Sequence, residues 1–244
     1  MKRSILTFTF LALSFQAANA QWWNSNKKIN GNGDYSSDTR NVSDYEQVSL
    51  EGFIDVELVA GTEGDLKIEA ESNLLEYIVT EVQNGILKIS VEKGVQLDPS
   101  RNKEIRVTVP FESLEAVSLT GSGDITSSDE IQAATFSVRV TGSGDVNLVL
   151  DAGTVEGKVV GSGDLGLKGT ATELEFMVSG SGDIEASRLK ATRASATVSG
   201  SGDIAVHATE SLHSRVNGSG DIIYSGNPQK QDFKTSGSGS ISGR

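Results

Sequence analysis

Gly121-Ser122-Gly123-Asp124 is the first full copy of a tetrapeptide that recurs through the second half of the chain. The same four residues return at 142–145, 161–164, 180–183, 200–203 and 218–221, and residues 237–240 read Gly-Ser-Gly-Ser. Successive copies start 21, 19, 19, 20, 18 and 19 residues apart. A period of about 19 residues held over so long a stretch is typical of a solenoid, in which each repeat packs on its neighbours.

The residues that flank each tetrapeptide alternate between apolar and polar. Phe136, Val138 and Val140 lead into the second copy with polar residues between them. An aliphatic residue follows the Asp of every copy: Ile125, Val146, Leu165, Ile184, Ile204 and Ile222. Period-two alternation with β-branched residues predicts half-buried strands. Each repeat is therefore predicted to be a strand, a Gly-Ser-Gly corner, a second strand and a second turn, such as residues 151–154.

These repeats predict an all-β fold, namely a single-stranded parallel β-helix with rungs of about 19 residues and right-handed winding. In a parallel stack each corner lies on the preceding one, which explains the constant offset between copies. An antiparallel meander closed into a barrel is the alternative. A meander would not require the same corner sequence at a constant spacing, so we favour the solenoid.

Four segments follow from composition. Residues 1–20 have a basic start, an apolar stretch and an Ala18-Asn19-Ala20 ending, which predict a signal peptide cleaved near Ala20 and export from the cytoplasm. Residues 21–44 are polar and include Gly31-Asn-Gly-Asp34, which we interpret as a degenerate copy of the corner. Residues 45–118 are predicted to be an irregular β cap at the N-terminal end, and residues 119–244 the repeat β-helix.

The cap contains one strong local signal. Asn84-Gly85 lies between two alternating runs and predicts a hairpin. A helix over residues 74–82 is the competing interpretation of the first run. After the N-terminal segment, no stretch of the sequence is long and apolar enough to predict a membrane span.

Composition excludes several classes of protein. The 244 residues include no Cys and 2 His, which excludes disulfide frameworks and zinc-thiolate sites and argues against a histidine-rich metal centre. The 33 acidic residues exceed the 21 basic ones, for a net charge of −12, so we do not expect a nucleic-acid partner. We expect no cofactor.

The candidate constellation is the set of repeated aspartates. Its members are Asp124, Asp145, Asp164, Asp183, Asp203 and Asp221. We expect them to be structural corner residues that accept hydrogen bonds from backbone N–H groups of their own turn, on a face that could also contact a ligand. The alternative is a ladder of cation sites, because Ca²⁺ prefers carboxylate oxygens. The corner role is our prediction, and we assign no metal ligand and no catalytic residue.

The sequence resembles a secreted bacterial family called "putative autotransporter adhesin, head GIN domain", which began as a domain of unknown function. The resemblance rests on residues 53–58, 85–89 and 107–110 and on the periodic Gly-Ser-Gly-Asp copies, and it covers residues 29–244. It implies a β-helical protein of the bacterial surface or surroundings, and it supplies no catalytic residues.

The function predicted from these features is a non-enzymatic, exported, adhesin-like protein of the cell envelope that binds a glycan or a cell-surface protein through a rigid face. Two alternatives remain open. One is a carbohydrate-active β-helix enzyme, a polysaccharide lyase or hydrolase, although the sequence lacks a local acid–base cluster. The other is a structural protein that self-assembles into homo-oligomers through exposed rung edges or faces.

Overall fold

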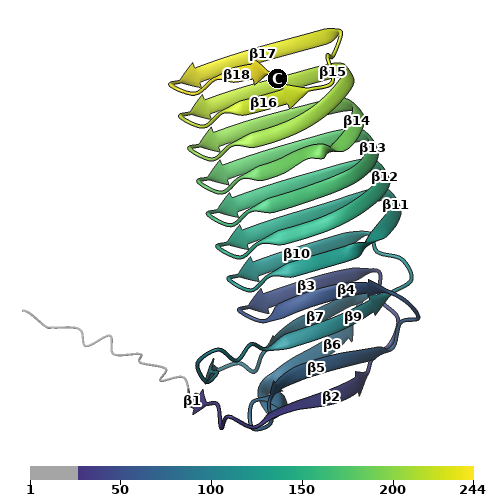
Figure 1. Cartoon of the computed structure of the whole chain (residues 1–244), viewed down its shortest axis with the longest axis vertical. Helices are drawn as coiled ribbons and strands as arrows, with labels where there is room; N and C mark the ends of the chain where they lie inside the picture. The colour runs from purple at the N-terminus through teal and green to yellow at the C-terminus, as the bar shows by residue number, and fades with distance from the viewer. Residues whose placement is uncertain (1–26) are drawn as a thin grey trace, which may run out of the picture.

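The structure is a computed structural model that describes residues 27–244. The signal peptide and the cleavage predicted near Ala20 lie outside the described residues. The described part of the chain is almost entirely β-structure, with one short 3₁₀ helix. The predicted parallel β-helix is confirmed: rung lies on rung along one axis, and the strands stack as a ladder (Figure 1). None of the helical segments among residues 27–244 has the length and apolar character needed to cross a membrane.

Each central rung is one long strand that bends back between two successive corners. These strands are β11 (Ile125–Gly142), β12 (Val146–Gly161), β13 (Leu165–Gly180), β14 (Ile184–Gly200) and β15 (Ile204–Gly218). Every one pairs in parallel with the next, and the pairing aligns Gly142, Gly161, Gly180, Gly200 and Gly218 in one column. The last rung is divided among β16 (Ile222–Ser225), β17 (Lys230–Gly237) and β18 (Ile241–Gly243).

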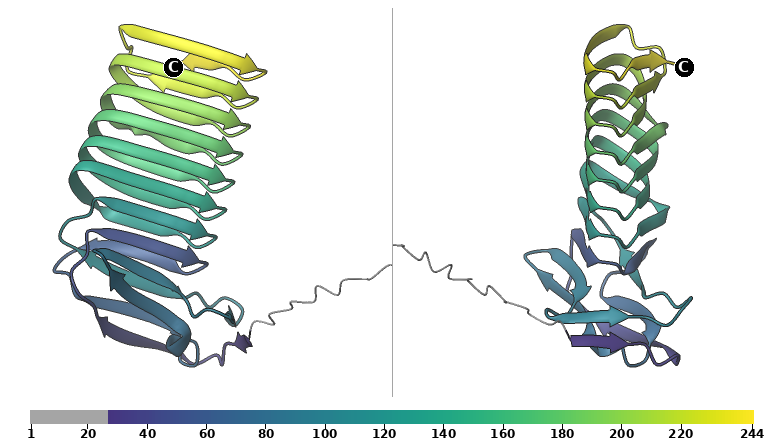
Figure 2. Two further views of the ribbon diagram at one scale, coloured as in Figure 1. Left: turned by 180° about the vertical axis from the view of Figure 1, so that it is seen from behind. Right: turned by 90° about the vertical axis from the view of Figure 1, so that its left-hand side faces the viewer.

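The second turn predicted at residues 151–154 is instead a bend inside β12. The strand continues through this bend, and Asp151, Ala152 and Thr154 stay paired with residues of β13. A gradual bend keeps the hydrogen bonds between rungs, so the chain needs no separate turn there. The cross-section consequently has one sharp edge at the corners and one rounded edge, with two sheets between them (Figure 2).

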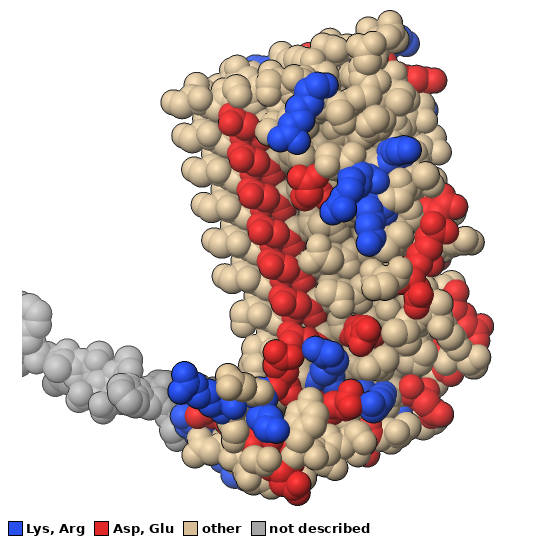
Figure 3. Space-filling model, in the orientation of Figure 1, with Lys and Arg blue, Asp and Glu red and all other residues tan. Residues whose placement is uncertain are grey.

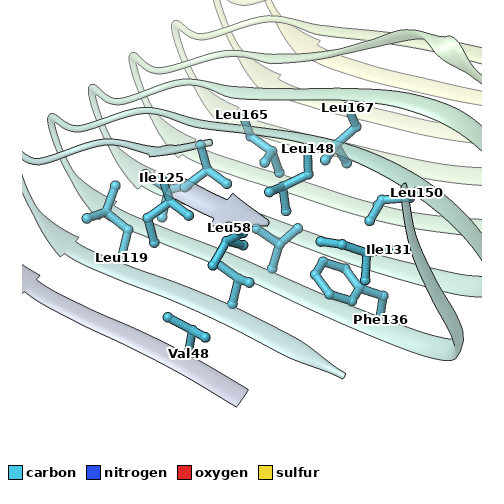
Figure 4. Close-up of a cluster of buried hydrophobic side chains, with 14 of the residues drawn as sticks. Val48, Leu58, Leu119, Ile125, Ile131, Phe136, Leu148, Leu150, Leu165 and Leu167 are labelled. Atoms are coloured by element: carbon cyan, nitrogen blue, oxygen red, sulfur yellow. The ribbon is translucent and has the colours of Figure 1, made fainter. Parts of the chain in front are cut away.

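Apolar columns fill the space between the two sheets. Val140, Val159, Val178, Val198 and Val216 form one such column, and every member is buried. On the other side of the corner, Val146, Leu165, Ile184, Ile204 and Ile222 form a second buried column. Figure 4 shows side chains of this kind meeting between the layers. The inward faces predicted from alternation are therefore the faces that make the core.

The ladder continues below the first full tetrapeptide. β10 (Ala116–Gly121) pairs with β3 (Gln47–Gly52), and the start of β11 pairs with β4 (Asp55–Ala60). β3 then pairs with β7 (Ile86–Val91), and β4 pairs with β9 (Arg106–Phe111). Residues 47–60 thus form a rung whose next rung begins only at residue 116, after a long excursion of the chain.

That excursion closes the N-terminal end of the solenoid. β6 (Ile78–Gln83) forms a hairpin with β7, and β2 (Tyr35–Asn41) and β5 (Asp65–Glu71) add antiparallel strands to the other sheet. β1 (Lys27–Asn30) and β8 (Val95–Asp98) make a small separate sheet. These antiparallel additions replace the regular rungs, so the stacking of parallel rungs stops at this end.

Two local predictions in this region have opposite outcomes. The hairpin at Asn84-Gly85 is confirmed, and both residues have positive φ, 54° and 76°, as a two-residue hairpin turn requires. The competing helix over residues 74–82 is wrong: only the 3₁₀ turn Leu75–Tyr77 is helical, and β6 starts at the next residue. Ile78 is buried, whereas most of the strand that follows it is partly exposed, as on the outer strand of a sheet.

One buried carboxylate ties this cap together. Glu71 is 1% exposed, and its carboxylate accepts hydrogen bonds from the Gly33 N–H, the Ser100 N–H (2.7 Å) and the Ser100 hydroxyl (2.6 Å). Burial raises its pKa, but the Ser100 and Gly33 donors and the charge of Lys103 together outweigh burial, so the pKa is lowered below the ordinary glutamate value. The folded cap therefore favours the ionised form.

This arrangement predicts an acid-sensitive cap. A carboxyl whose pKa is lower in the folded than in the unfolded state stabilises the fold above its unfolded pKa, and this stabilisation disappears as the pH falls through the folded pKa. We expect Glu71→Gln to lower the melting temperature at pH 7, and we expect the difference from the parent to shrink as the pH falls below the ordinary glutamate pKa. Melting curves across this pH range test it. A difference that does not change with pH would contradict the role assigned to the ionised carboxylate.

Candidate functional site: the aspartate column and its groove

The corners stack through backbone hydrogen bonds between glycine carbonyls and the rung above. At the corner 180–183, the N–H groups of Ser181 and Gly182 donate to the carbonyl of Gly161 in the rung below, at 2.8 and 3.1 Å. Gly180 has φ +133°, a conformation that favours glycine. A Cβ on Gly182 would lie 2.0 Å from the carbonyl oxygen of Gly163. The corner sequence is therefore required by how closely one rung lies on the next.

The six repeated aspartates lie one above another beside these corners, and we call them the aspartate column: Asp124, Asp145, Asp164, Asp183, Asp203 and Asp221. In the first five, Oδ1 accepts a hydrogen bond from the backbone N–H of the aspartate in the next rung. The distance is 2.9 Å from the Asp164 carboxylate to the Asp183 N–H and 2.7 Å from the Asp183 carboxylate to the Asp203 N–H. At the C-terminal end Ser240 donates both its N–H and its hydroxyl to Asp221.

The predicted hydrogen bond within each turn is thus wrong. The Asp side chain crosses to the rung above, because the corner N–H groups of its own rung already donate to a glycine carbonyl of the rung below. Stacking places a free Asp N–H directly above each carboxylate, which a single corner considered alone does not show. The aspartates consequently link neighbouring rungs as well as lying along their edge.

The column begins one rung earlier than the repeat. Gly52, with φ +120°, takes the place of the first glycine, and its carbonyl accepts the N–H groups of Ser122 and Gly123. Asp55 takes the place of the aspartate and accepts the Asp124 N–H at 3.1 Å. Partial burial raises the pKa of Asp55; the Asp124 N–H lowers it, and the Asp124 charge raises it further. Residues 31–34, interpreted as a degenerate corner, instead precede β2 in the cap.

On the surface the column is a continuous acidic stripe that runs parallel to the long axis (Figure 3). Beside it lies a shallow groove of about 670 Å³, which we call the groove. Asp145, Asp164, Asp183 and Asp203 form its acidic side. Lys168 and Arg188, paired in adjacent strands, lie on the opposite side. The groove thus runs across several rungs between an acidic and a basic border.

Two small outward-facing residues lower the floor of the groove, in a column that also holds Asn147 and Glu185. Gly166 and Ala205 belong to the column that lies between the aspartates and the basic pair. The side chain of Asn147 lies over Gly166, where a Cβ would come within 2.2 Å of its Oδ1. Amide and carboxylate groups therefore line the floor and one side, and the groove offers hydrogen-bond acceptors along its whole length.

A comparison with protein families shows to which family the chain belongs. The family model described as "Putative auto-transporter adhesin, head GIN domain" matches residues 44–228. The chain belongs to this family. The match spans the aspartate column, the groove and the part of the cap that follows residue 43, so these are parts of a head GIN domain. The family resemblance predicted from the sequence is therefore confirmed.

Solved structures share the fold. A "putative adhesin" from Bacteroides fragilis NCTC 9343 is 24% identical, with a TM-score of 0.82 over 88% of this chain and 100% of that one. A "putative lipid binding protein" from Parabacteroides distasonis ATCC 8503 is 28% identical, with a TM-score of 0.74 over 89% and 100%. A "putative adhesin" from the same organism is 24% identical, with a TM-score of 0.70 over 89% and 100%. None of the curated proteins matches the chain.

The two histidines of this head GIN domain lie apart from the groove. His207 and His213 lie on β15, where their Nδ1 atoms contact Ser225 Oγ at 3.0 Å and Asp232 Oδ2 at 2.8 Å. Within residues 27–244, no group of three or more His, Cys, Asp and Glu side chains is arranged to hold a metal ion. The two histidines each contact the following rung and contribute nothing to the groove lining.

The hydrogen bond between rungs makes a prediction for Asp183. Asp183→Asn keeps an oxygen that can accept the Asp203 N–H and removes one charge between two like charges, so it should change stability little. Asp183→Ala removes the acceptor and should cost about 0.5–1.5 kcal/mol. Thermal melting of both variants tests the order. We expect calcium to leave the parent's melting temperature nearly unchanged. A calcium-dependent rise that Asp183→Asn abolishes would instead establish a cation site.

Proposed function

We propose that this chain is a non-enzymatic, exported, adhesin-like surface protein that binds an extended, positively charged ligand in the groove. The observation that carries the proposal is the acidic border of the groove, in which carboxylates from consecutive rungs stand at the strand spacing of about 4.8 Å. Such a border offers a repeated row of acceptors to a ligand that is itself a chain. Family membership supports an exported or surface location.

The rigidity of the border favours binding without a large ordering cost. Each aspartate is held by a backbone N–H of the next rung, so neighbouring carboxylates keep a fixed spacing before any ligand arrives. Preorganised groups lose less conformational freedom on binding than mobile ones. Lys168 and Arg188 on the opposite border favour ligands that also carry hydroxyl or carboxyl groups. Amino-sugar polymers have this chemistry, and lysine-rich peptide segments share their repeated positive charge.

The same regularity argues against the carbohydrate-active enzyme. Acid–base cleavage of a glycosidic bond needs two carboxyl groups in different environments, so that one is protonated while the other is ionised. Asp145, Asp164, Asp183 and Asp203 all have the same neighbours: a corner on one side and an N–H of the next rung at 2.7–2.9 Å. Release of reducing ends from a polysaccharide incubated with the protein would establish the enzyme instead.

The test compares probes of different charge. The exported chain is titrated calorimetrically with chitosan oligosaccharides, oligolysine, neutral glucan oligosaccharides and oligogalacturonate. We expect the two cationic probes to bind and the neutral and anionic probes to bind much more weakly. Binding should weaken at high salt, because screening acts on exposed charges. No heat with either cationic probe, at low as well as physiological salt, would overturn the proposal.

Two variants and a control locate the binding. The double variant Asp164→Asn/Asp183→Asn removes two charges from the border and keeps the hydrogen-bond acceptors, and Ala205→Trp fills the floor without changing charge. Each should weaken cationic probe binding by about tenfold or more. The control Glu156→Gln/Glu175→Gln removes two exposed charges from the opposite sheet. An equal loss in this control would show nonspecific attraction by net charge and would contradict a site in the groove.

A further inference from the structure

The C-terminal end of the solenoid is an open edge. β17 pairs only with β15, and β18 pairs only with β16; within residues 27–244 no strand pairs with their outer sides. All eight residues of β17 are exposed, and the strand lies at one extremity of the molecule (Figure 1). Open strand edges present unpaired N–H and C=O groups and are templates for pairing with another chain. Among residues 27–244, no antiparallel strands cover this end as they cover the N-terminal one.

The direction of the unpaired backbone groups follows from the rung below. The carbonyl of Gly218 points toward the last rung, where it accepts the N–H groups of Ser238 and Gly239. Gly218 is paired with Gly237, and alternate residues of a strand direct their backbone groups to the same side. Gln231, Phe233 and Thr235 share this alternation with Gly237. Their N–H and C=O groups therefore point away from β15, into solvent.

The same strand carries an exposed aromatic side chain at its centre. Phe233 is 36% exposed, and its ring centroid lies 5.3 Å from that of Tyr224. Phe233 stands in register above Ser214, which is fully buried. The inward column thus ends in a large apolar residue that is only partly covered. A further strand above β17 would complete the burial of this ring.

Charges on the outward face are arranged around Phe233. Asp232 contacts His213 at 2.8 Å and Arg215 at 3.6 Å in the rung below. Lys234 stands in register above Arg215, a like charge, and no carboxylate of the described residues lies within 4 Å of its Nζ. The edge therefore carries an acidic and a basic residue on either side of Phe233, and the basic one lacks an acidic partner.

We propose that two copies of this chain associate end to end through β17, antiparallel, with a two-fold axis at Phe233. In this register Phe233 faces Phe233 of the second copy, and Gln231 faces Thr235, so residues with free backbone groups exchange hydrogen bonds. Asp232 faces Lys234 of the second copy, twice by symmetry. Such an interface is self-complementary, as a two-fold contact between identical subunits must be.

Alternative registers bring like charges together. The inward faces of the two strands lie on the same side of the shared sheet only when the two-fold axis passes through a residue and not between two residues. The nearest alternative axes therefore pass through Asp232 or Lys234. An axis at Asp232 places Asp232 opposite Asp232 of the second copy, and Lys230 opposite Lys234 of the second copy. An axis at Lys234 places Lys234 opposite Lys234 of the second copy. Like charges directly opposite each other destabilise strand pairing, so the charge pattern favours the axis at Phe233 over an axis at either neighbouring residue.

The test uses charge exchange across the axis. Sedimentation equilibrium of the exported chain at low and physiological salt should give twice the mass of one chain. Asp232→Lys alone opposes Lys to Lys, and Lys234→Asp alone opposes Asp to Asp, so each single variant should sediment as a monomer. The double variant Asp232→Lys/Lys234→Asp should dimerise again. An equimolar mixture of the two single variants should form a heterodimer, because each supplies the charge that the other lacks.

Each outcome has one meaning. A parent that stays monomeric throughout the concentration range overturns the proposal. A dimer that survives in both single variants forms through another surface and also overturns it. Asp232→Lys also removes the contact with His213, and the loss of this contact alone would weaken the packing of β17. Recovery of the dimer in the mixture is therefore the result that assigns the interface to the paired charges. Failure of both the mixture and the double variant to dimerise would refute the register centred on Phe233.

Discussion

Gly182→Ala should destabilise the solenoid by at least about 3 kcal/mol, although it adds a single methyl group. The new Cβ would lie 2.0 Å from the carbonyl oxygen of Gly163 and 3.0 Å from a methyl of Val159. The carbonyl carbon of Gly163 would be 3.0 Å away, so the obstacle is backbone and cannot rotate aside. Relief requires the two rungs to separate at the corner, which weakens the hydrogen bonds from Ser181 and Gly182 to Gly161. Chemical denaturation of the purified variant measures the loss.

Ser181→Ala is the matched control for this substitution. Ser181 is exposed at the neighbouring position of the same corner, so its replacement should change stability by less than about 0.5 kcal/mol. The contrast separates the contact between rungs from any general sensitivity of the corner. If the two variants unfold at the same denaturant concentration, the rungs are not held as closely as the structure indicates.

Phe136→Ala should cost about 3–5 kcal/mol, because it leaves a cavity at the rounded edge. The ring is fully buried and lies near Ile131 and Leu150, where the chain bends from one sheet to the other (Figure 4). These large side chains fill the interior of the bend. Thr135→Ala, at the exposed neighbouring position, should have little effect. Equal denaturation midpoints for the two variants would mean that the bend relaxes to fill the space.

The repeated corner could be predicted because the physical requirement is local and recurs. Glycine is needed at two positions of each corner, for backbone conformation at Gly180 and for close approach at Gly182, and the sequence shows both. Alternation around the corner then indicated which side chains face inward. The alternation can be recognised within one repeat, whereas the close approach at Gly182 involves the rung below and is indicated only by the recurrence of the glycine.

The first rung was missed because its corner has a different sequence. Gly52-Phe53-Ile54-Asp55 keeps the first glycine and the aspartate but replaces the second glycine with Ile54. That glycine is needed only where a corner lies on another corner below it, and Gly123 lies above Ile54. The intervening residues 61–115 also broke the period. The sequence did contain a signal for this first corner: a glycine followed three residues later by an aspartate, between two strands of alternating apolar and polar residues.

The hydrogen bonds of the aspartates could not be predicted from a single corner, because donor and acceptor belong to different rungs. The groove depends in the same way on small residues in different rungs, Gly166 in β13 and Ala205 in β15. Packing inside the solenoid shows a similar compensation. A Cβ at Gly157 would lie 2.7 Å from the ring of Phe176 in the next rung, so the glycine leaves room for the aromatic ring. Sequence spacing alone does not reveal which residues compensate one another.

The stacking of nearly identical rungs lets evolution change the protein's length in whole units. Each of the central strands, β12 to β14, makes its extensive contacts only with the strand before and the strand after it. Duplication or loss of one repeat would therefore leave the remaining rungs with the same kind of neighbour above and below. It would lengthen or shorten the acidic border by one carboxylate and about 4.8 Å. A lineage could in this way change the length of the acidic border while the remaining rungs keep the contacts they have.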